Sequence, residues 1–187
     1  MLKKMRGFTL IELLIVVAII GILAALLIPN ALEAIQKAKQ KSSMKEIMSI
    51  ATASADYITD HGDWSLALHN GPLATADNFV GVVATFYLKI CPINDPWNTP
   101  YQVFTGESAT SGFLSGANAA DIGADDFAVC SFGRDKASGP LAAANYTTGT
   151  PEAGFYNVSK MADFNNDLVV WNGNWVVGPR TALVTGS

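Results

Sequence analysis

The strongest pattern in the sequence is an uninterrupted apolar run close to the N-terminus. Between Leu13 and Ile28 the chain reads LLIVVAIIGILAALLI, without a polar side chain. The wider segment Phe8 to Ile28 corresponds to about 31 Å of α-helix at about 1.5 Å per residue. This length is sufficient to cross the hydrocarbon core of a bilayer. The pattern therefore predicts a transmembrane helix over residues 8–28.

Helical periodicity continues beyond the apolar run, but on one face only. Apolar side chains recur every three or four residues, as in an amphipathic helix packed on a globular domain: Met44, Ile47, Met48, Ala51, Ala55 and Ile58. Gly62 follows His61 and suits a helix C-cap. We therefore expect one long helix over residues 8–61, half transmembrane and half packed on a head domain.

The residue composition changes after residue 61, and residues 62–187 predict a β-rich globular head domain. Short aromatic or β-branched runs alternate with segments rich in Gly, Asn, Asp and Ser, which favours strands over Val80–Tyr87, Tyr101–Phe104, Asp126–Phe132 and Leu168–Trp175. Segments near 105–123 and 136–160 are too long for simple turns. The predicted fold class is α+β: a long N-terminal helix, then a small C-terminal antiparallel β-sheet with long loops.

Composition and charge exclude several functional classes. The formal net charge is −4, and we interpret the one basic cluster, Lys37, Lys39, Lys41 and Lys45, as a solvated helix face. The sequence has no broad basic patch of the kind that dominates nucleic-acid binding, so a nucleic-acid partner is not expected. Common hydrolase, zinc-protease, phosphate-loop and dinucleotide motifs are absent from the sequence. The two histidines, His61 and His69, lie in a loop-like segment and are expected at the surface. We expect no enzymatic activity.

The two cysteines, Cys91 and Cys130, do not form a CxxC motif or a zinc-ligand pattern. In an exported domain, two such cysteines favour a single disulfide. Two separate buried thiols are the alternative.

A short basic leader, Lys3, Lys4 and Arg6, precedes the apolar run and resembles a signal peptide. No A-x-A-like cleavage site follows the run, and the helical pattern continues past it. Four lysines beyond the run nearly balance the leader, so charge counting alone does not settle the orientation. Because the leader charges abut the apolar run, an inside N-terminus is favoured.

Glu12 and Pro29 are unusual in such a helix. A carboxylate in hydrocarbon costs several kcal/mol unless it is paired, and such residues usually mark function. Cleavage after Gly7 would create an α-amine on Phe8, and in a staggered filament this amine could meet Glu12 of a neighbour. A glutamate that merely reaches the headgroups is the alternative. Pro29 removes a backbone donor, so a kink or local melting is expected there.

The segment Lys3-Lys4-Met5-Arg6-Gly7-Phe8-Thr9-Leu10-Ile11-Glu12-Leu13 resembles the class III signal of type IV pilins and type II secretion pseudopilins. The resemblance implies that a membrane aspartyl peptidase cuts between Gly7 and Phe8 and methylates the new N-terminus. It also implies that Glu12 acts in assembly, and that the stretch from Gly21 to Pro29 can unwind in assembled filaments.

Three segments of the head resemble the major pseudopilin of type II secretion: Asp95-Pro96-Trp97-Asn98-Thr99-Pro100-Tyr101, Ser131-Phe132-Gly133-Arg134-Asp135 and Asp167-Leu168-Val169-Val170-Trp171. Asn98 replaces the usual Gly, but asparagine also tolerates a left-handed backbone. In that family the loop between the last two segments binds calcium, and here this loop is lengthened.

The residues themselves also suggest a calcium site. Oxygen-bearing side chains at alternate positions, Asp163, Asn165 and Asp167, have the spacing of a calcium loop, although Leu168 stands where an EF-hand has Gly. A polar turn before the last strand is the alternative. Together with the resemblance, this spacing predicts a structural calcium ion with Asp135, Asp163, Asn165 and Asp167 as candidate ligands.

Three hypotheses for function remain. The first is the major pseudopilin of a type II secretion-like system, anchored once in the inner membrane before it polymerises into a periplasmic filament. Its expected partners are further copies of itself, a prepilin peptidase, an inner-membrane assembly platform and minor pseudopilins. The second is the major subunit of a surface type IV pilus, for adhesion, motility or DNA uptake. The third is a membrane-anchored binding module that never polymerises, against which Glu12 argues.

Overall fold

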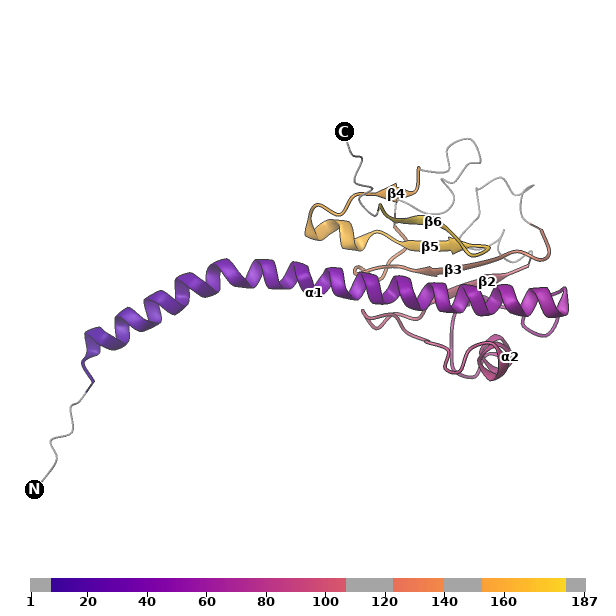
Figure 1. Cartoon of the computed structure of the whole chain (residues 1–187), viewed down its shortest axis with the longest axis horizontal. Helices are drawn as coiled ribbons and strands as arrows, with labels where there is room; N and C mark the ends of the chain where they lie inside the picture. Colours follow the sequence, from indigo (N-terminus) through magenta and orange to yellow (C-terminus); the bar gives the residue numbers. More distant parts are fainter. Residues whose placement is uncertain (1–7, 107–122, 140–152, 181–187) are drawn as a thin grey trace, which may run out of the picture. The chain divides into compact units, whose positions relative to one another are not determined.

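The computed structural model describes residues 8–106, 123–139 and 153–180 (Figure 1). The chain forms two compact units, Met1–Lys37 and Ala38–Ser187. The first element, α1 (Leu10–His61), is a single helix of 52 residues that contributes to both units. The long helix expected from the sequence is therefore present.

The second unit contains a six-stranded sheet. After α1 its elements are β1 (Asn70–Pro72), α2 (Asn78–Phe86), β2 (Gln102–Thr105), β3 (Phe127–Ser131), β4 (Phe155–Tyr156), η3 (Met161–Asn165), β5 (Leu168–Trp171) and β6 (Asn174–Pro179). The strand order is β1-β2-β3-β5-β6-β4. All neighbours are antiparallel except β4 and β6, which are parallel. The predicted α+β class is confirmed.

The sheet separates two core clusters, because successive strand residues point to opposite faces. The helix-side cluster contains Val103, Val129 and Val170 together with the buried stripe of α1, whose largest members are Ile47, Ile50 and Tyr57. The far-side cluster contains their direct neighbours along the same strands, Phe104, Cys130 and Val169. Burying each such aliphatic or aromatic side chain contributes about 1.5–3 kcal/mol. Figure 1 shows this part of α1 running beside the strands.

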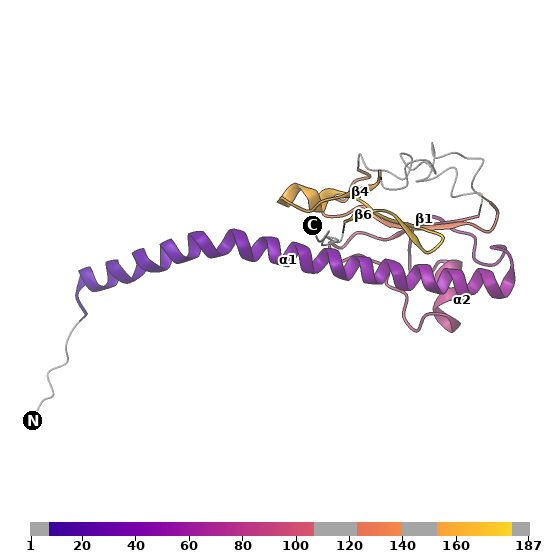
Figure 2. The same cartoon turned by 45° about the horizontal axis from the view of Figure 1, so that its top comes forward.

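The strand predicted over Val80–Tyr87 is wrong, because residues 80–86 belong to α2 and Tyr87 is its C-cap. The β-branched run favoured a strand, but Phe79, Val80 and Val83 are buried in the helix-side cluster at helical spacing. Burial in this cluster therefore overrides the intrinsic β preference of valine. In both views α2 lies beside the C-terminal part of α1 (Figures 1 and 2).

The predicted strand Leu168–Trp175 is two strands, β5 and β6, joined by a tight turn at Asn172-Gly173. Both turn residues have positive φ, 47° and 80°, as a type I′ hairpin requires. The short strands β1 and β4 were not predicted, and β4 interrupts the segment 136–160 that was expected to be a loop. Parts of both long segments, 107–122 and 140–152, lie outside the described residues.

Asp95 connects the proline-rich turn to the sheet. Its buried carboxylate accepts hydrogen bonds from the backbone N–H groups of Trp97 (3.0 Å) and Thr99 (2.9 Å) and from the Ser131 hydroxyl (2.7 Å) at the end of β3. Asn98 has a φ of 64°, so it adopts the left-handed conformation that glycine usually supplies at such a position. The Asp-Pro-Trp resemblance therefore marks a turn fastened to the sheet by one carboxylate.

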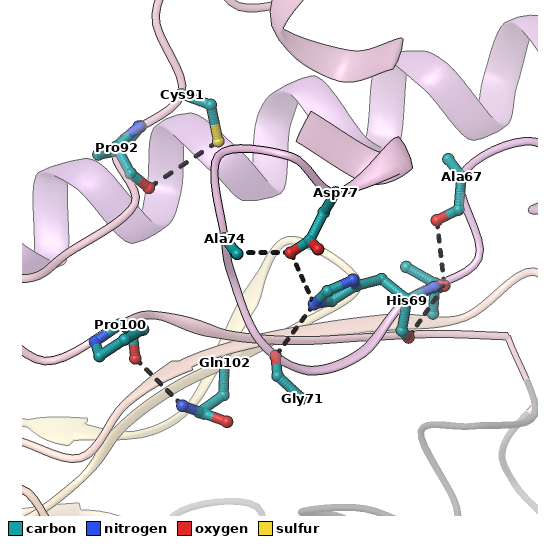
Figure 3. Close-up of polar contacts among 10 residues, drawn as sticks. Ala67, His69, Gly71, Ala74, Asp77, Cys91, Pro92, Pro100 and Gln102 are labelled. Atoms are coloured by element: carbon teal, nitrogen blue, oxygen red, sulfur yellow. Dashed lines mark hydrogen bonds and ion pairs between the residues drawn. The ribbon is translucent and has the colours of Figure 1, made fainter. Parts of the chain in front are cut away.

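His69 fastens the chain between β1 and α2, and the surface position predicted for it is wrong (Figure 3). Its side chain is only 12% exposed. The ring nitrogen Nε2 lies 3.2 Å from the Gly71 carbonyl oxygen and 3.8 Å from an Asp77 carboxylate oxygen, which also accepts a 2.6 Å hydrogen bond from the Ala74 N–H. His61, in contrast, is exposed as expected.

We expect Asp95→Ala to lower the free energy of unfolding by about 3 kcal/mol, because three donors inside the head lose their acceptor. Chemical denaturation of the full chain in detergent measures this. The control is Asp125→Ala, which removes an exposed carboxylate and should change stability by less than about 0.5 kcal/mol. Equal stability of the two variants would contradict the structural role of Asp95.

Candidate functional site

The first turn of α1 is closed by a reciprocal contact between Thr9 and Glu12. The Glu12 carboxylate accepts hydrogen bonds from the Thr9 N–H (2.9 Å) and hydroxyl (2.7 Å), and the Glu12 N–H donates to the Thr9 hydroxyl (3.3 Å). This is a capping box. The Thr-x-x-Glu spacing was visible in the sequence, and its capping role was missed. Glu12 is therefore held at the helix start even without a neighbouring subunit.

Phe8 stands one residue before this cap and is 76% exposed. Gly7, the other predicted processing residue, lies outside the described residues. The predicted cut would leave the new α-amine on Phe8, directly next to the capped turn. The structure therefore presents the residue that would become the N-terminus, with no side-chain packing around it in the part of this unit that is described.

The N-terminal unit has a surface suited to lipid. Its best 18-residue window has a mean hydropathy of 3.1 and is unburied, and large apolar side chains are exposed all around it, from Leu10 to Ile35. An exposed apolar surface of this extent is rare on a soluble monomer. By length and composition α1 can cross a membrane, so the unit fits a membrane anchor.

Pro29 does not melt the helix, which continues unbroken from Leu10 to His61. Local melting is therefore not a property of the isolated chain, although Pro29 cannot donate the hydrogen bond that normally fills this place in the ladder. The Asn30 side chain donates to the Leu26 carbonyl oxygen (3.3 Å), which gives a carbonyl in the affected turn an additional partner. Whether the segment unwinds in a filament stays a prediction.

Gly133 brings the segment Ser131–Asp135 against η3. Its φ is 68°, and a Cβ atom at this position would lie 2.7 Å from the Asn166 carbonyl oxygen and 2.9 Å from that of Phe164. Only glycine allows this close approach of two backbones. The Arg134 N–H donates to the Phe164 carbonyl oxygen (2.9 Å). With the pairing of Ser131 and Leu168 between β3 and β5 and the Ser131–Asp95 hydrogen bond, all three head segments singled out in the sequence lie next to one another.

Asp167 is the most unusual of the predicted calcium ligands. It is fully buried, and one carboxylate oxygen accepts a 2.8 Å hydrogen bond from the Gly139 N–H. Its other oxygen, Oδ1, has no partner among the described residues. Burial raises the pKa of Asp167, the Gly139 hydrogen bond opposes this shift and the negative charge of Asp135 adds to it, with a net value of about 7. A buried, incompletely paired carboxylate of this kind is costly.

Asp163, in contrast, caps the short helix η3. Its carboxylate accepts hydrogen bonds from the backbone N–H groups of Ser159 (2.7 Å) and Lys160 (2.8 Å), which cap η3 and lower its pKa. Asn165 lies half-buried on the same short helix. Within the described ranges, no group of three or more His, Cys, Asp or Glu side chains could hold a metal ion. Asp135 and Asp167 remain the candidate pair.

The predicted disulfide between Cys91 and Cys130 is contradicted, because both residues are free and buried. Cys91 belongs to the helix-side cluster and Cys130 to the far-side cluster, so the sheet lies between them. Cys91 contacts the Pro92 carbonyl oxygen (Figure 3). Burial raises the pKa of the Cys91 thiol to about 11 and that of Cys130 well above its ordinary value, so neither is a ready nucleophile.

The chain is similar to known proteins over its N-terminal segment and over about two thirds of its length. Residues 2–28 match the prokaryotic N-terminal methylation motif. The chain is similar to type II secretion system core protein G of Aeromonas hydrophila, with 30% identity over 131 residues that cover 66% of this chain and 90% of that protein. The protein of the same name in Pseudomonas aeruginosa is 35% identical over 106 residues, covering 54% of this chain and 73% of its own length.

The methylation motif, the capped apolar helix and the small antiparallel-dominated sheet define a pilin-like protein with a prepilin N-terminus. Within this class, the chain belongs to the family of type II secretion system core protein G. It is also similar to the type IV major pilin protein PilA of Myxococcus xanthus, with 45% identity over 60 residues that cover 32% of this chain and 27% of that protein. No solved structure is significantly similar to the chain.

Asp167 gives the protein a specific pH dependence. Its pKa rises from 3.8 to about 7 on folding, so between these values the folded state binds more protons than the unfolded state. The free energy of unfolding therefore falls as pH rises from about 4 to 7, by up to about 4 kcal/mol. Asp167→Asn should lose this slope, as measured by denaturation in EDTA at several pH values. Parallel profiles for wild type and variant would contradict the assignment.

Proposed function

We propose that the chain is the major pseudopilin of a type II secretion-like system, a non-enzymatic subunit that polymerises into a periplasmic filament. The observation that carries this proposal is the extent of similarity to core protein G, which reaches 90% of the Aeromonas relative. A protein that shared only a membrane-targeting signal would match over the first residues alone. The Asp95 turn supports the proposal, because a head segment that resembles this family is fastened into the fold.

A type IV pilus subunit is the second candidate, and the match to PilA favours it. That match covers 60 residues and only 27% of the pilin, whereas the match to core protein G covers more than twice as many residues. Both candidates use the same N-terminal machinery. They differ in the location of the filament: a pseudopilin filament stays in the periplasm, whereas a type IV pilus extends outside the cell.

The proposed life cycle begins with one span in the inner membrane. A prepilin peptidase removes the leader between Gly7 and Phe8 and methylates the new N-terminus, as the methylation motif supports. The subunit then leaves the membrane at an assembly platform, together with minor pseudopilins, and joins further copies of itself. Removing the leader takes away Lys3, Lys4 and Arg6, the charges that held the N-terminus on the cytoplasmic side.

Pairing between subunits centres on Glu12 and the Phe8 amine. Moving a lone carboxylate into an apolar filament core is unfavourable unless a cation meets it. The capping box satisfies Glu12 by hydrogen bonds to Thr9 but leaves its negative charge uncompensated. The Phe8 amine of a neighbouring subunit supplies that charge, and the capped turn holds the carboxylate ready to receive it.

Substitutions can separate this pairing from the capping contact. Glu12→Gln keeps a side chain that can close the capping box but removes the charge, whereas Thr9→Ala removes the cap and keeps the charge. We expect Glu12→Gln and Glu12→Ala to abolish filaments while membrane insertion and leader cleavage continue, because only the charge is needed for pairing. Thr9→Ala should still assemble.

The assay is electron microscopy of cells that express the chain with its own export genes, and a gel shift reports cleavage. The matched control is Glu33→Ala, which removes an exposed ion pair with Lys37 and should assemble normally. Normal filaments from Glu12→Gln would contradict the pairing. Absence of filaments from wild type under overexpression would contradict the filament proposal, and long surface fibres at normal expression would support the pilus candidate instead.

We further propose that Asp135 and Asp167 hold a structural calcium ion. Calcium prefers carboxylate and carbonyl oxygens, and the orphaned Oδ1 atom of buried Asp167 is a donor of this type. The raised pKa of Asp167 also fits, because a nearby cation would compensate the charge that burial disfavours. Asp163 fits less well, since its carboxylate already caps η3. The ion would supply a positive charge between the end of β3 and the start of β5.

Calcium should therefore stabilise the protein more at pH 8 than at pH 5, where Asp167 is largely protonated. At a concentration 100-fold above its Kd, the gain is about 2.7 kcal/mol, measured as a rise in melting temperature. Asp167→Asn should abolish the response, while the control Asp163→Asn should lower stability but keep it. A calcium response in Asp167→Asn equal to that of wild type would contradict the site.

A further inference from the structure

The exposed face of α1 in the second unit carries two like-charged pairs. Lys41 and Lys45 lie one turn apart, and Asp56 and Asp60 repeat the same spacing further along. All four side chains are exposed, on the side opposite the buried stripe that faces the sheet. The residues between the two pairs on this face, such as Ser49 and Thr52, are uncharged. We call this surface the charge stripe.

The charge stripe is unfavourable for the isolated helix. Like charges at i and i+4 destabilise a helix, and the stripe contains one such pair of each sign. Asp60 also stands in the last turn, where the helix dipole disfavours a negative charge. Among the described residues, neither lysine forms an ion pair, whereas Lys37 pairs with Glu33 one turn earlier. Within the chain, Asp60 accepts a hydrogen bond from the Tyr87 hydroxyl (2.9 Å), but the fold gives no comparable reason for the charges of Lys41, Lys45 and Asp56.

The pattern is instead complementary to itself. Each pair spans four residues, and Lys41 precedes Asp56 by the same 15 residues that separate Lys45 from Asp60. At about 1.5 Å per residue this corresponds to about 22 Å. Two parallel copies offset by this distance would place both lysines of one opposite both aspartates of the other. Flexible lysine stems tolerate departures from the ideal offset.

We propose that the charge stripe is a contact surface between staggered, parallel copies of this chain, with Lys41 and Lys45 of one copy facing Asp56 and Asp60 of the next. Antiparallel copies could also pair these charges, but chains that share one membrane orientation meet in parallel. The inference rests on the proposed filament and specifies a second contact in it, away from Glu12. Opposite charges at a repeated contact fix register and suppress wrong alignments.

Cross-linking tests the contact directly. A zero-length carbodiimide joins a lysine amine to an aspartate carboxylate only when they touch, and within one rigid helix Lys41 and Asp56 are about 22 Å apart. Any Lys41–Asp56 or Lys45–Asp60 product is therefore intermolecular. We expect both, by mass spectrometry of treated cells that express the full chain with its export genes. The pattern Lys41–Asp60 with Lys45–Asp56 would show antiparallel contact and overturn the proposal.

Charge reversal provides the functional test. Lys41→Glu/Lys45→Glu and Asp56→Lys/Asp60→Lys should each lower filament yield at least tenfold, and the quadruple variant should recover to within about twofold of wild type, because it restores opposite charges. Melting of each full-length variant checks the fold, since Asp60 also accepts a hydrogen bond from the Tyr87 hydroxyl (2.9 Å). The control, Lys89→Glu/Lys136→Glu, makes the same change in net charge as Lys41→Glu/Lys45→Glu at other exposed sites and should assemble normally.

The outcomes separate this inference from the proposed filament. If both double variants form normal filaments and the wild-type chain does not give the expected cross-links, the charge-stripe contact is overturned and the filament proposal stands. The expected cross-links without any filament by electron microscopy support the contact and overturn the filament proposal. If neither filaments nor cross-links are found, both proposals are overturned.

Discussion

One continuous helix with two different environments is the constraint on which the rest of the protein depends. Up to Lys37 its apolar side chains point in every direction and are exposed. From Gln40 onward only one stripe is buried, and Ile47, Ile50 and Tyr57 in this stripe organise the helix-side cluster. The head sheet needs this stripe, because its inner face would otherwise expose valines and aromatic residues to water. The head is therefore folded onto the continuation of its own anchor.

Much of this arrangement could be predicted because the signals are long or chemically specific. An apolar run followed by a one-sided helical pattern has few other interpretations. The strands β2 and β3 were also found, since their alternating residues are buried on two faces of the sheet. The left-handed backbone at Asn98 follows from its residue type and its turn. In each case a local pattern and the tertiary environment favour the same structure.

The errors arose where distant parts of the chain decide the outcome. The valines of α2 favour a strand by themselves, whereas Val80 and Val83 are buried at helical spacing in the cluster that also contains the buried stripe of α1. Cys91 and Cys130 are compatible with a disulfide in sequence, but they point into clusters on different sides of the sheet. The distinct roles of Asp163 and Asp167 depend on which backbone N–H groups reach them. Two locally readable features were nevertheless overlooked: the Asn172-Gly173 turn and the Thr9-x-x-Glu12 capping box.

The exposed apolar surface of the N-terminal unit has a consequence for how assembly is powered. Lipid tails are as apolar as leucine, so moving such a helix from a bilayer into a bundle of like helices gains little from the hydrophobic effect. The membrane and the filament core are then nearly equivalent solvents for this segment. Its transfer between them is close to balanced, so a few polar contacts can set the direction. In the proposed filament this balance holds in both directions, so the apolar segment itself would place no large barrier on the return of a subunit to a bilayer.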